Sequence, residues 1–244
     1  MVAPIDNQSD PLLGDFFDLS FVNITTAGAS PTQAAFTRQF DSAGDRASSD
    51  FDQRHNLVFY SWWNVPSESG DGWLTAVTRN WRVAEMAAFR TGFPYTVRTG
   101  ATGALLNQRA DIVDAAHIAA PLGTAAAPGS VALLNPAAFA APATGLPGSS
   151  GRNAFGGPGL WNIDLSVSRS IALRALGESR RLILRADFFN AFNHANLNNP
   201  VARLGSPIFG QASYGRLDYN NGFPAMVPLN ETPRQIQIMV KVEF

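Results

Sequence analysis

The sequence predicts an all-β protein in which roughly five strands form an antiparallel up-and-down meander. Three observations lead to this class. Several segments alternate apolar and polar residues with a period of two, and the connections between them are alternately short and long. Charged residues make up only 15% of the 244-residue chain, whereas soluble domains carry about 25%.

The segment that organises the prediction is the C-terminal stretch, residues 233–244. Successive side chains point to opposite faces of a strand. One face therefore carries five apolar residues: Ile236, Ile238, Val240, Val242 and Phe244. The length matches the roughly 9–11 residues with which a tilted strand crosses a bilayer. An edge strand of a soluble sandwich would show the same pattern, so the remaining segments must distinguish the two interpretations.

The chain before residue 99 alternates between irregular and extended segments. Residues 1–53 are polar and are predicted as an extracellular-type loop, with one short apolar stretch at 16–22 that could be a strand. Residues 55–65 and 81–89 are rich in the aromatic and β-branched residues that favour strands. A turn is expected at 66–78, and residues 95–97 are expected to continue the second strand beyond an interruption at Gly92 and Pro94.

The second half of the chain contains the most regular alternation. Residues 160–173 place apolar side chains on one face, namely Trp161, Ile163, Leu165, Val167 and Ile171. Residues 181–192 predict another strand after a short turn at 174–180. Tracts rich in Ala, Gly, Pro and Asn occupy 99–158 and 193–232 and are predicted as long loops.

The alternating connection lengths indicate a membrane barrel. Outer-membrane β-barrels have short periplasmic turns and long extracellular loops. Counting back from a chain end in the periplasm puts both long tracts outside and both short turns inside. Residues 54–244 are therefore predicted to form transmembrane strands of a partial outer-membrane β-barrel with long extracellular loops, located in the bacterial outer membrane.

This topology places aromatic residues at both membrane interfaces, where amphipathic rings are favoured. Trp62, Trp63 and Trp81 are expected near the inner interface, and Trp161 and Phe188 near the outer one. Aromatic residues that fill a soluble core remain the alternative explanation.

Charged side chains lie on the opposite, polar face of the predicted strands. They are Asp164, Arg185, Asp187, Lys241 and Glu243. In a barrel this face lines the lumen, where a ladder of arginine and carboxylate groups across neighbouring strands would satisfy the charges. We expect their role to be structural.

Charge and motif content argue against several other functions. The formal net charge of −1 gives no electrostatic basis for binding nucleic acid. His55, His117 and His194 lie in unrelated segments, and no nucleophile motif, phosphate-binding loop or dinucleotide fingerprint is present. We therefore expect no enzyme activity, no metal and no cofactor. Residues 1–6 lack a basic n-region and an apolar h-region, so no signal peptide is expected in this chain.

Several segments resemble, in order, the C-terminal part of TonB-dependent outer-membrane receptors, and within them the Oar-like group common in acidobacterial genomes. The matching stretches are SDFDQRH (49–55), GFPYTV (92–97), LNPAAF (134–139), GRNAFGGPG (151–159) and FFNAFNH (188–194). The terminal strand completes the set, and the resemblance runs from residue 50 to residue 244.

The resemblance implies a wall segment of a barrel with about twenty-two strands around a plug. Phe244 and the apolar residues before it would then direct barrel assembly. The implied partners are outer-membrane lipid, the barrel-assembly machinery, the rest of the barrel and the plug, with the TonB complex reached only through the plug. Because a partial sheet leaves backbone groups unsatisfied in hydrocarbon, we expect a fragment of a larger receptor for an unidentified substrate, inactive alone.

Two other interpretations stay open. A small autonomous outer-membrane barrel or adhesin could close by oligomerising, and it would form heat-modifiable oligomers in detergent. A soluble carbohydrate-binding β-sandwich would stay in solution without detergent and would bind glycans. An outer-membrane hydrolase ranks last, because the sequence contains no catalytic constellation.

Overall fold

The computed structural model describes residues 5–6, 43–49, 52–66, 72–99, 108–173, 180–214 and 233–244. These residues form two compact units. The strand unit comprises the described residues within 57–89, 161–195 and 231–244, and the loop unit comprises those within 1–56, 90–160 and 196–230. Each unit is thus built from segments that are far apart in the sequence.

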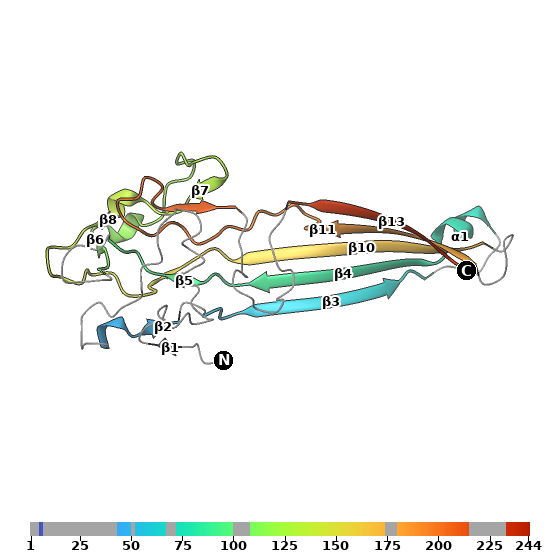
Figure 1. Cartoon of the computed structure of the whole chain (residues 1–244), viewed down its shortest axis with the longest axis horizontal. Coiled ribbons are helices and arrows are strands. Elements are labelled where there is room, and N and C mark those ends of the chain that lie inside the picture. The colour runs from blue at the N-terminus through green and yellow to red at the C-terminus, as the bar shows by residue number, and fades with distance from the viewer. Residues whose placement is uncertain are drawn as a thin grey trace. The chain divides into compact units, whose positions relative to one another are not determined.

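Five long strands form the sheet of the strand unit. They are β3 (Asn56–Asn64), β4 (Trp81–Arg90), β10 (Leu160–Ala172), β11 (Arg181–Phe189) and β13 (Gln235–Glu243). Their order is β13-β11-β10-β4-β3, so each long strand lies beside the next one in the sequence (Figure 1). The antiparallel pairing of β11 with both β10 and β13 confirms the predicted all-β meander. Within the described residues the sheet is open, with β3 and β13 at its edges.

The register gives this sheet two chemically different faces. On one side of the sheet, β13 contributes Ile236, Ile238, Val240 and Val242, and their partners on β11 are Phe188, Ala186, Leu184 and Leu182, in that order. The same four β11 residues lie opposite Leu165, Val167, Arg169 and Ile171 on β10. We call this side the apolar face. Because side chains alternate, the other side carries Ser166, Ser168, Arg185, Asp187 and Lys241, and we call it the polar face.

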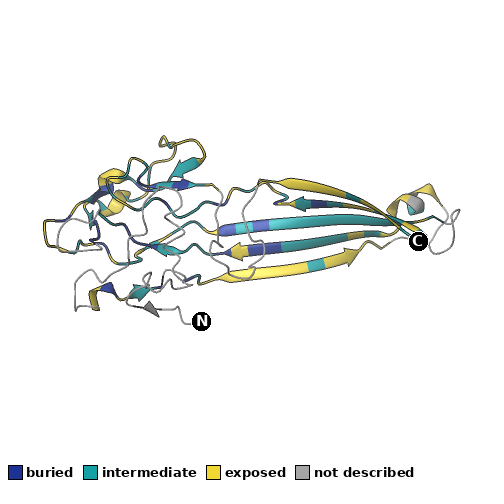
Figure 2. Cartoon of the chain, in the orientation of Figure 1, coloured by how far each residue is buried: buried dark blue, intermediate teal, exposed yellow. Residues whose placement is uncertain are grey.

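The same two faces continue onto β4 and β3. The guanidinium of Arg169 lies 5.5 Å from the ring centre of Trp81, so Trp81 belongs to the apolar face. The backbone N–H of Val65 donates to the carbonyl of Trp81 over 2.9 Å, which aligns β3 with β4. Figure 2 shows that the two edge strands, β3 and β13, are the most exposed of the sheet.

β11 is shorter than the predicted strand over 181–192. It ends at Phe189 because Asn190 adopts a left-handed backbone conformation, with φ of 47°. The Asn190 side chain then accepts a hydrogen bond from the backbone N–H of His194 and donates one to its carbonyl, both over 2.9 Å. Asparagine tolerates this conformation better than most residues, and the resulting turn removes residues 190–192 from the strand.

Two further expectations need correction. Residues 95–97 do not continue β4 in the long sheet, because β5 (Pro94–Tyr95) pairs instead with β9 (Phe155–Gly156). The turn predicted at 66–78 contains a short helix, α1 (Trp73–Thr78). The strand considered at 16–22 and most of the turn at 174–180 lie outside the described residues. None of the helices in the described part of the chain is long and apolar enough to cross a membrane.

The loop unit consists of short elements from the tracts predicted as long loops and from the N-terminal region. Its strand pairs are β1 (Ile5–Asp6) with β2 (Ala47–Ser48), β5 with β9, β6 (Asp111–Ile112) with β8 (Phe139–Ala140), and β7 (Ser130–Ala132) with β12 (Gln211–Ser213). Three 3-10 helices join them, η2 (Ala43–Asp45), η3 (Ala115–His117) and η4 (Pro136–Ala138). The long tracts are therefore folded segments that pair with one another.

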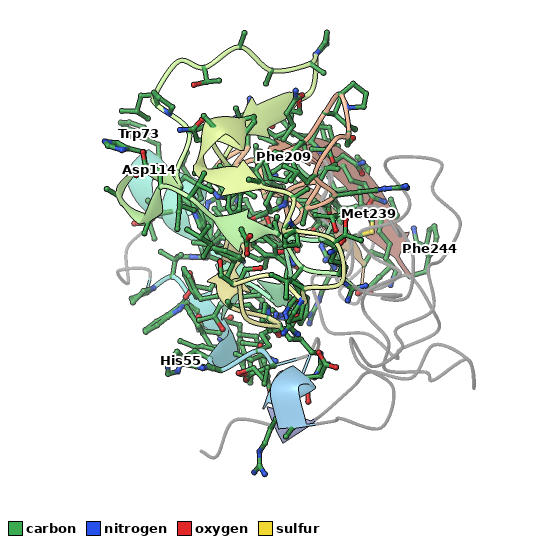
Figure 3. All side chains as sticks on the ribbon, turned by 90° about the vertical axis from the view of Figure 1, so that its left-hand side faces the viewer. His55, Trp73, Asp114, Phe209, Met239 and Phe244 are labelled. Carbon is green, nitrogen blue, oxygen red and sulfur yellow. The ribbon has the colours of Figure 1, made fainter. Side chains whose placement is uncertain are left out.

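A small hydrophobic core holds the loop unit together. Its buried members are Tyr95, Val97, Ala110, Leu134, Ala138, Phe139 and Phe209. Phe139 packs edge-on against Phe155 and Phe209, with ring centres 5.8 Å and 5.6 Å apart. Figure 3 shows Phe209 surrounded by other side chains of the protein. Burial in this core raises the pKa of the Tyr95 hydroxyl well above its usual range.

Candidate functional site

The apolar side chains of β13 are exposed in the part of the chain that the structure describes. Val242 is the least exposed of these apolar residues, at 44%, Ile238 is 77% exposed, and Phe244, just beyond the strand, is 87% exposed. Arg180 places its guanidinium 5.7 Å from the Phe244 ring centre. A row of apolar side chains exposed to this degree requires an apolar environment or a partner. Four of the five residues predicted from the terminal alternation therefore lie on one face of β13, namely Ile236, Ile238, Val240 and Val242. The fifth, Phe244, directly follows the strand in the chain.

The five charged residues predicted for the lumen lie on the polar face, but their ion pairs run along strands. Arg185 Nε is 2.8 Å from Asp187 Oδ1, and Lys241 Nζ is 2.8 Å from Glu243 Oε1. Asp164 accepts hydrogen bonds from the Asn162 side chain and the Asn190 backbone. Glu243 also lies opposite Arg181 on β11, so here an arginine and a carboxylate face each other across neighbouring strands, as expected. The Arg185–Asp187 and Lys241–Glu243 ion pairs instead run along one strand.

The register explains why the pairs form along the strands. Arg185 lies opposite Ser168 on β10 and Met239 on β13. Asp187 lies opposite Ser166 and Gln237. Neither has an opposite charge directly across, whereas positions two apart on one strand share a face and lie within reach of long side chains.

The predicted interface aromatics occupy both ends of the sheet. Trp63 and Trp81 lie at the end where β3 and β4 meet in a short connection, which we call the turn end, and Trp161 and Phe188 lie at the opposite, loop end. Trp62 is on the polar face, stacked on Tyr60 with ring centres 6.3 Å apart. Their position at membrane interfaces stays a prediction.

The contacts of the tryptophans fit rings with one polar edge. Trp81 donates its indole N–H to the Val77 carbonyl over 2.7 Å. Trp161 stacks on the His194 ring at 4.0 Å and lies 6.2 Å from Phe192. Trp81 thus combines an apolar body with a polar contact at the end of a strand, as side chains at a lipid–water boundary do.

Sequence reasoning missed three polar residues on the apolar face, namely Ser61, Glu85 and Arg169. Glu85 is four residues after Trp81, so it shares the apolar side, and the Ser61 hydroxyl donates to its carboxylate over 3.0 Å. The Trp63 indole N–H donates to Ser61 over 2.8 Å. The period-two alternation from Trp81 to Phe89 was the signal that could have identified Glu85.

The motif glycines of the loop unit lie where two chain segments touch. A Cβ atom added to Gly92 would collide with the carbonyl group of Gly157. The backbone N–H of Gly157 also donates to the carbonyl of Phe93 over 2.9 Å. Only glycine allows this approach, which gives a physical reason for glycine in GFPYTV and GRNAFGGPG.

Polar contacts fix the segment 43–49 to the other segments of the loop unit. Asp45 and Arg109 form a buried ion pair over 2.6 Å. The Asn153 side chain donates to the Ser48 carbonyl over 2.7 Å, and its backbone N–H donates to the Thr96 hydroxyl over 2.8 Å. These bonds connect residues more than fifty positions apart, so they hold the long tracts in one arrangement.

Two of the three histidines have clear structural contacts. The Asp114 carboxylate lies 2.8 Å from the His117 ring, and this hydrogen bond lowers the pKa of Asp114. His194 stacks on Trp161. No group of three or more His, Cys, Asp or Glu side chains gathers in the part of the chain that the structure describes.

The sheet is an open antiparallel meander with one apolar face. It has aromatic residues at both ends and short connections at one end. These features together are typical of membrane β-sheets. The chain belongs to the family described as outer membrane beta barrel domain, whose model matches residues 20–237. Comparison with curated proteins and with solved structures finds no match. The family places the protein among outer-membrane barrels.

Proposed function

We propose that the chain is the C-terminal wall segment of a TonB-dependent outer-membrane receptor of the Oar-like group. The observation that carries the proposal is the combination of the terminal strand β13, with its exposed apolar side chains, and loop tracts folded around the motifs of the resemblance. The receptor would take up a scarce substrate with energy supplied from the inner membrane.

In this proposal each surface of the sheet has its own partner. The apolar face contacts outer-membrane lipid, and the polar face, with its paired charges, lines the lumen next to the plug. The free edges of β3 and β13 pair with further strands of the same barrel, because an unpaired strand edge in hydrocarbon costs several kcal/mol for each unsatisfied backbone group. The TonB complex is reached only through the plug.

The terminal strand has an additional role in this proposal. Phe244 and the alternating apolar residues before it are presented to the barrel-assembly machinery, which would add the edge of β13 to a template strand. The exposed Phe244 side chain and the exposed edge of β13 support this role. Catalysis and cofactor binding have no place in the proposal.

The genomic sequence upstream of Met1, translated in the same frame, tests the proposal. The expected result is a continuous reading frame with further alternating strands, a plug domain, an energy-coupling box and a signal peptide. A stop codon and a ribosome-binding site directly before Met1 would contradict it. The small autonomous barrel would then become the better explanation.

A further inference from the structure

Two large aromatic side chains stand exposed on the polar face of the sheet. Tyr60 and Trp62 on β3 are 70% and 64% exposed, and as residues two apart on one strand they share that face. Their ring centres lie 6.3 Å apart, and the ring planes differ by only 13°. The two nearly parallel rings form one apolar ridge along the strand, which we call the aromatic ridge.

A small side chain lies beside the aromatic ridge on the neighbouring strand. The backbone hydrogen bond from Val65 to Trp81 sets the register of β3 and β4, and a second backbone bond at the other end of these strands keeps the same register. Counting along both strands puts Ala84 directly opposite Trp62. A methyl group is too short to cover an indole ring, which explains why Trp62 stays exposed.

Hydrogen-bonding groups flank the aromatic ridge on the same face. Arg82 Nε donates to Asn64 Oδ1 over 3.1 Å at the turn end, and both residues are exposed. The backbone bond from Ser170 to Asn80 places Ser166 on β10 level with the ridge. Neighbouring strands are about 4.8 Å apart, so Ser166 stands about 10 Å across the sheet from β3. The strip between them has room for one sugar ring with its hydroxyl groups.

The ion pairs of the polar face carry no net charge. Arg185 pairs with Asp187, and Lys241 pairs with Glu243, each over 2.8 Å. Attraction of a charged ligand needs an excess of charge of one sign, whereas exposed aromatic rings favour contact with an apolar surface. The face therefore suits a neutral molecule that has both an apolar side and many hydroxyl groups.

We propose that the aromatic ridge is a binding site for a neutral, extended oligosaccharide. A pyranose ring has an apolar side formed by its C–H groups, and this side stacks on the aromatic ridge. The hydroxyl groups of the sugar then face Asn64, Arg82 and Ser166, which fix its orientation. As a substrate class this inference rests on the proposed function, because the polar face would then line the lumen through which a substrate passes. The binding itself does not depend on transport.

Isothermal titration calorimetry with cellohexaose tests the inference. The sample is the protein that the complete reading frame encodes, folded in micelles of a detergent without a sugar headgroup, since such a headgroup would compete. We expect cellohexaose to bind the unaltered protein and Trp62→Ala to weaken binding about tenfold or more, because one stacking surface is lost.

Trp63→Ala is the matched control. Trp63 is the next residue of the same strand and is 65% exposed, but it lies on the apolar face, so its removal should leave the affinity for cellohexaose unchanged. Trp62→Phe keeps a flat apolar ring and should retain most of the affinity, while Tyr60→Ala should weaken binding as Trp62→Ala does. Heat-modifiable mobility in electrophoresis confirms that each variant is folded.

Other outcomes of the titration would overturn the inference. They are the absence of binding heat with cellohexaose and equal losses of affinity in Trp62→Ala and Trp63→Ala. Tighter binding of hexagalacturonate, which has the same length but a carboxylate on every sugar, would exclude a neutral ligand. A lower unfolding temperature of Trp62→Ala without any saccharide binding would mean that the ridge packs against another part of the barrel or its plug.

The proposed function and this inference can fail separately. Cellohexaose binding by a protein whose reading frame starts at Met1 would keep the site but remove its role in uptake. An upstream plug without cellohexaose binding would keep the receptor and remove this substrate class.

Discussion

Glu85 places a carboxylate among the hydrocarbon side chains of the apolar face. Its hydrogen bond from Ser61, itself supported by Trp63, replaces only part of the hydration that a carboxylate has in water. Ionisable groups in contact with lipid are costly and are usually retained for a contact or a function. Glu85 is therefore the single residue whose substitution reports most directly on what the apolar face contacts.

We expect Glu85→Leu to raise the free energy of unfolding in lipid vesicles by about 1 kcal/mol or more when the chain is extended by its upstream strands, because lipid-facing charged side chains destabilise barrels by amounts of this order. Urea titration followed by tryptophan fluorescence measures the change. Glu243→Leu, on the polar face, is the control and should give no gain. A loss of stability in Glu85→Leu would mean that Glu85 contacts a polar partner instead of lipid.

Strands of the sheet could be predicted from the sequence because their signal is local. The alternation over 160–173 needs no knowledge of other segments, and β10 follows it to within one residue. The end of β11 was missed because a left-handed Asn190 decides it, and residue preferences do not reveal one backbone angle. The helix α1 was missed because its six residues are too few for a helical period.

The terminal strand gives a prediction at the same scale. If β13 is presented through its apolar face, Phe244→Ser should strongly reduce the amount of protein inserted in the outer membrane. Met239→Ser, on the polar face of the same strand, should have little effect. Both variants are compared with the unaltered sequence by membrane fractionation and protease protection, each in a chain extended by its upstream strands and an export signal. Equal insertion of the unaltered chain and Phe244→Ser would exclude an assembly role for Phe244.

At the scale of the whole molecule, the loop unit was the least predictable part. Its core joins Val97, Ala110 and Phe209, which come from three separate tracts. The Asp45–Arg109 pair joins positions 64 residues apart. Such contacts leave no period in the sequence, so tracts rich in Ala, Gly and Pro were taken as loops. The motifs of the resemblance marked these segments, and the structure supplies their packing reason in Gly92 and Gly157.

The open edges of the sheet give the prediction that separates the remaining interpretations. Among the described residues, β3 and β13 have no neighbour on their outer side, and each is nine residues long. In hydrocarbon, the backbone groups along these edges need partner strands. We therefore expect the chain alone to require detergent and to run as an unfolded monomer in unheated electrophoresis samples, while a chain extended by its upstream strands becomes heat-modifiable. Heat-modifiable oligomers of the chain alone would instead establish the autonomous barrel, since copies would then supply each other's missing edges. A chain that stays soluble without detergent and binds glycans would establish the sandwich, and it would require that the exposed apolar face of β13 be buried against a second sheet.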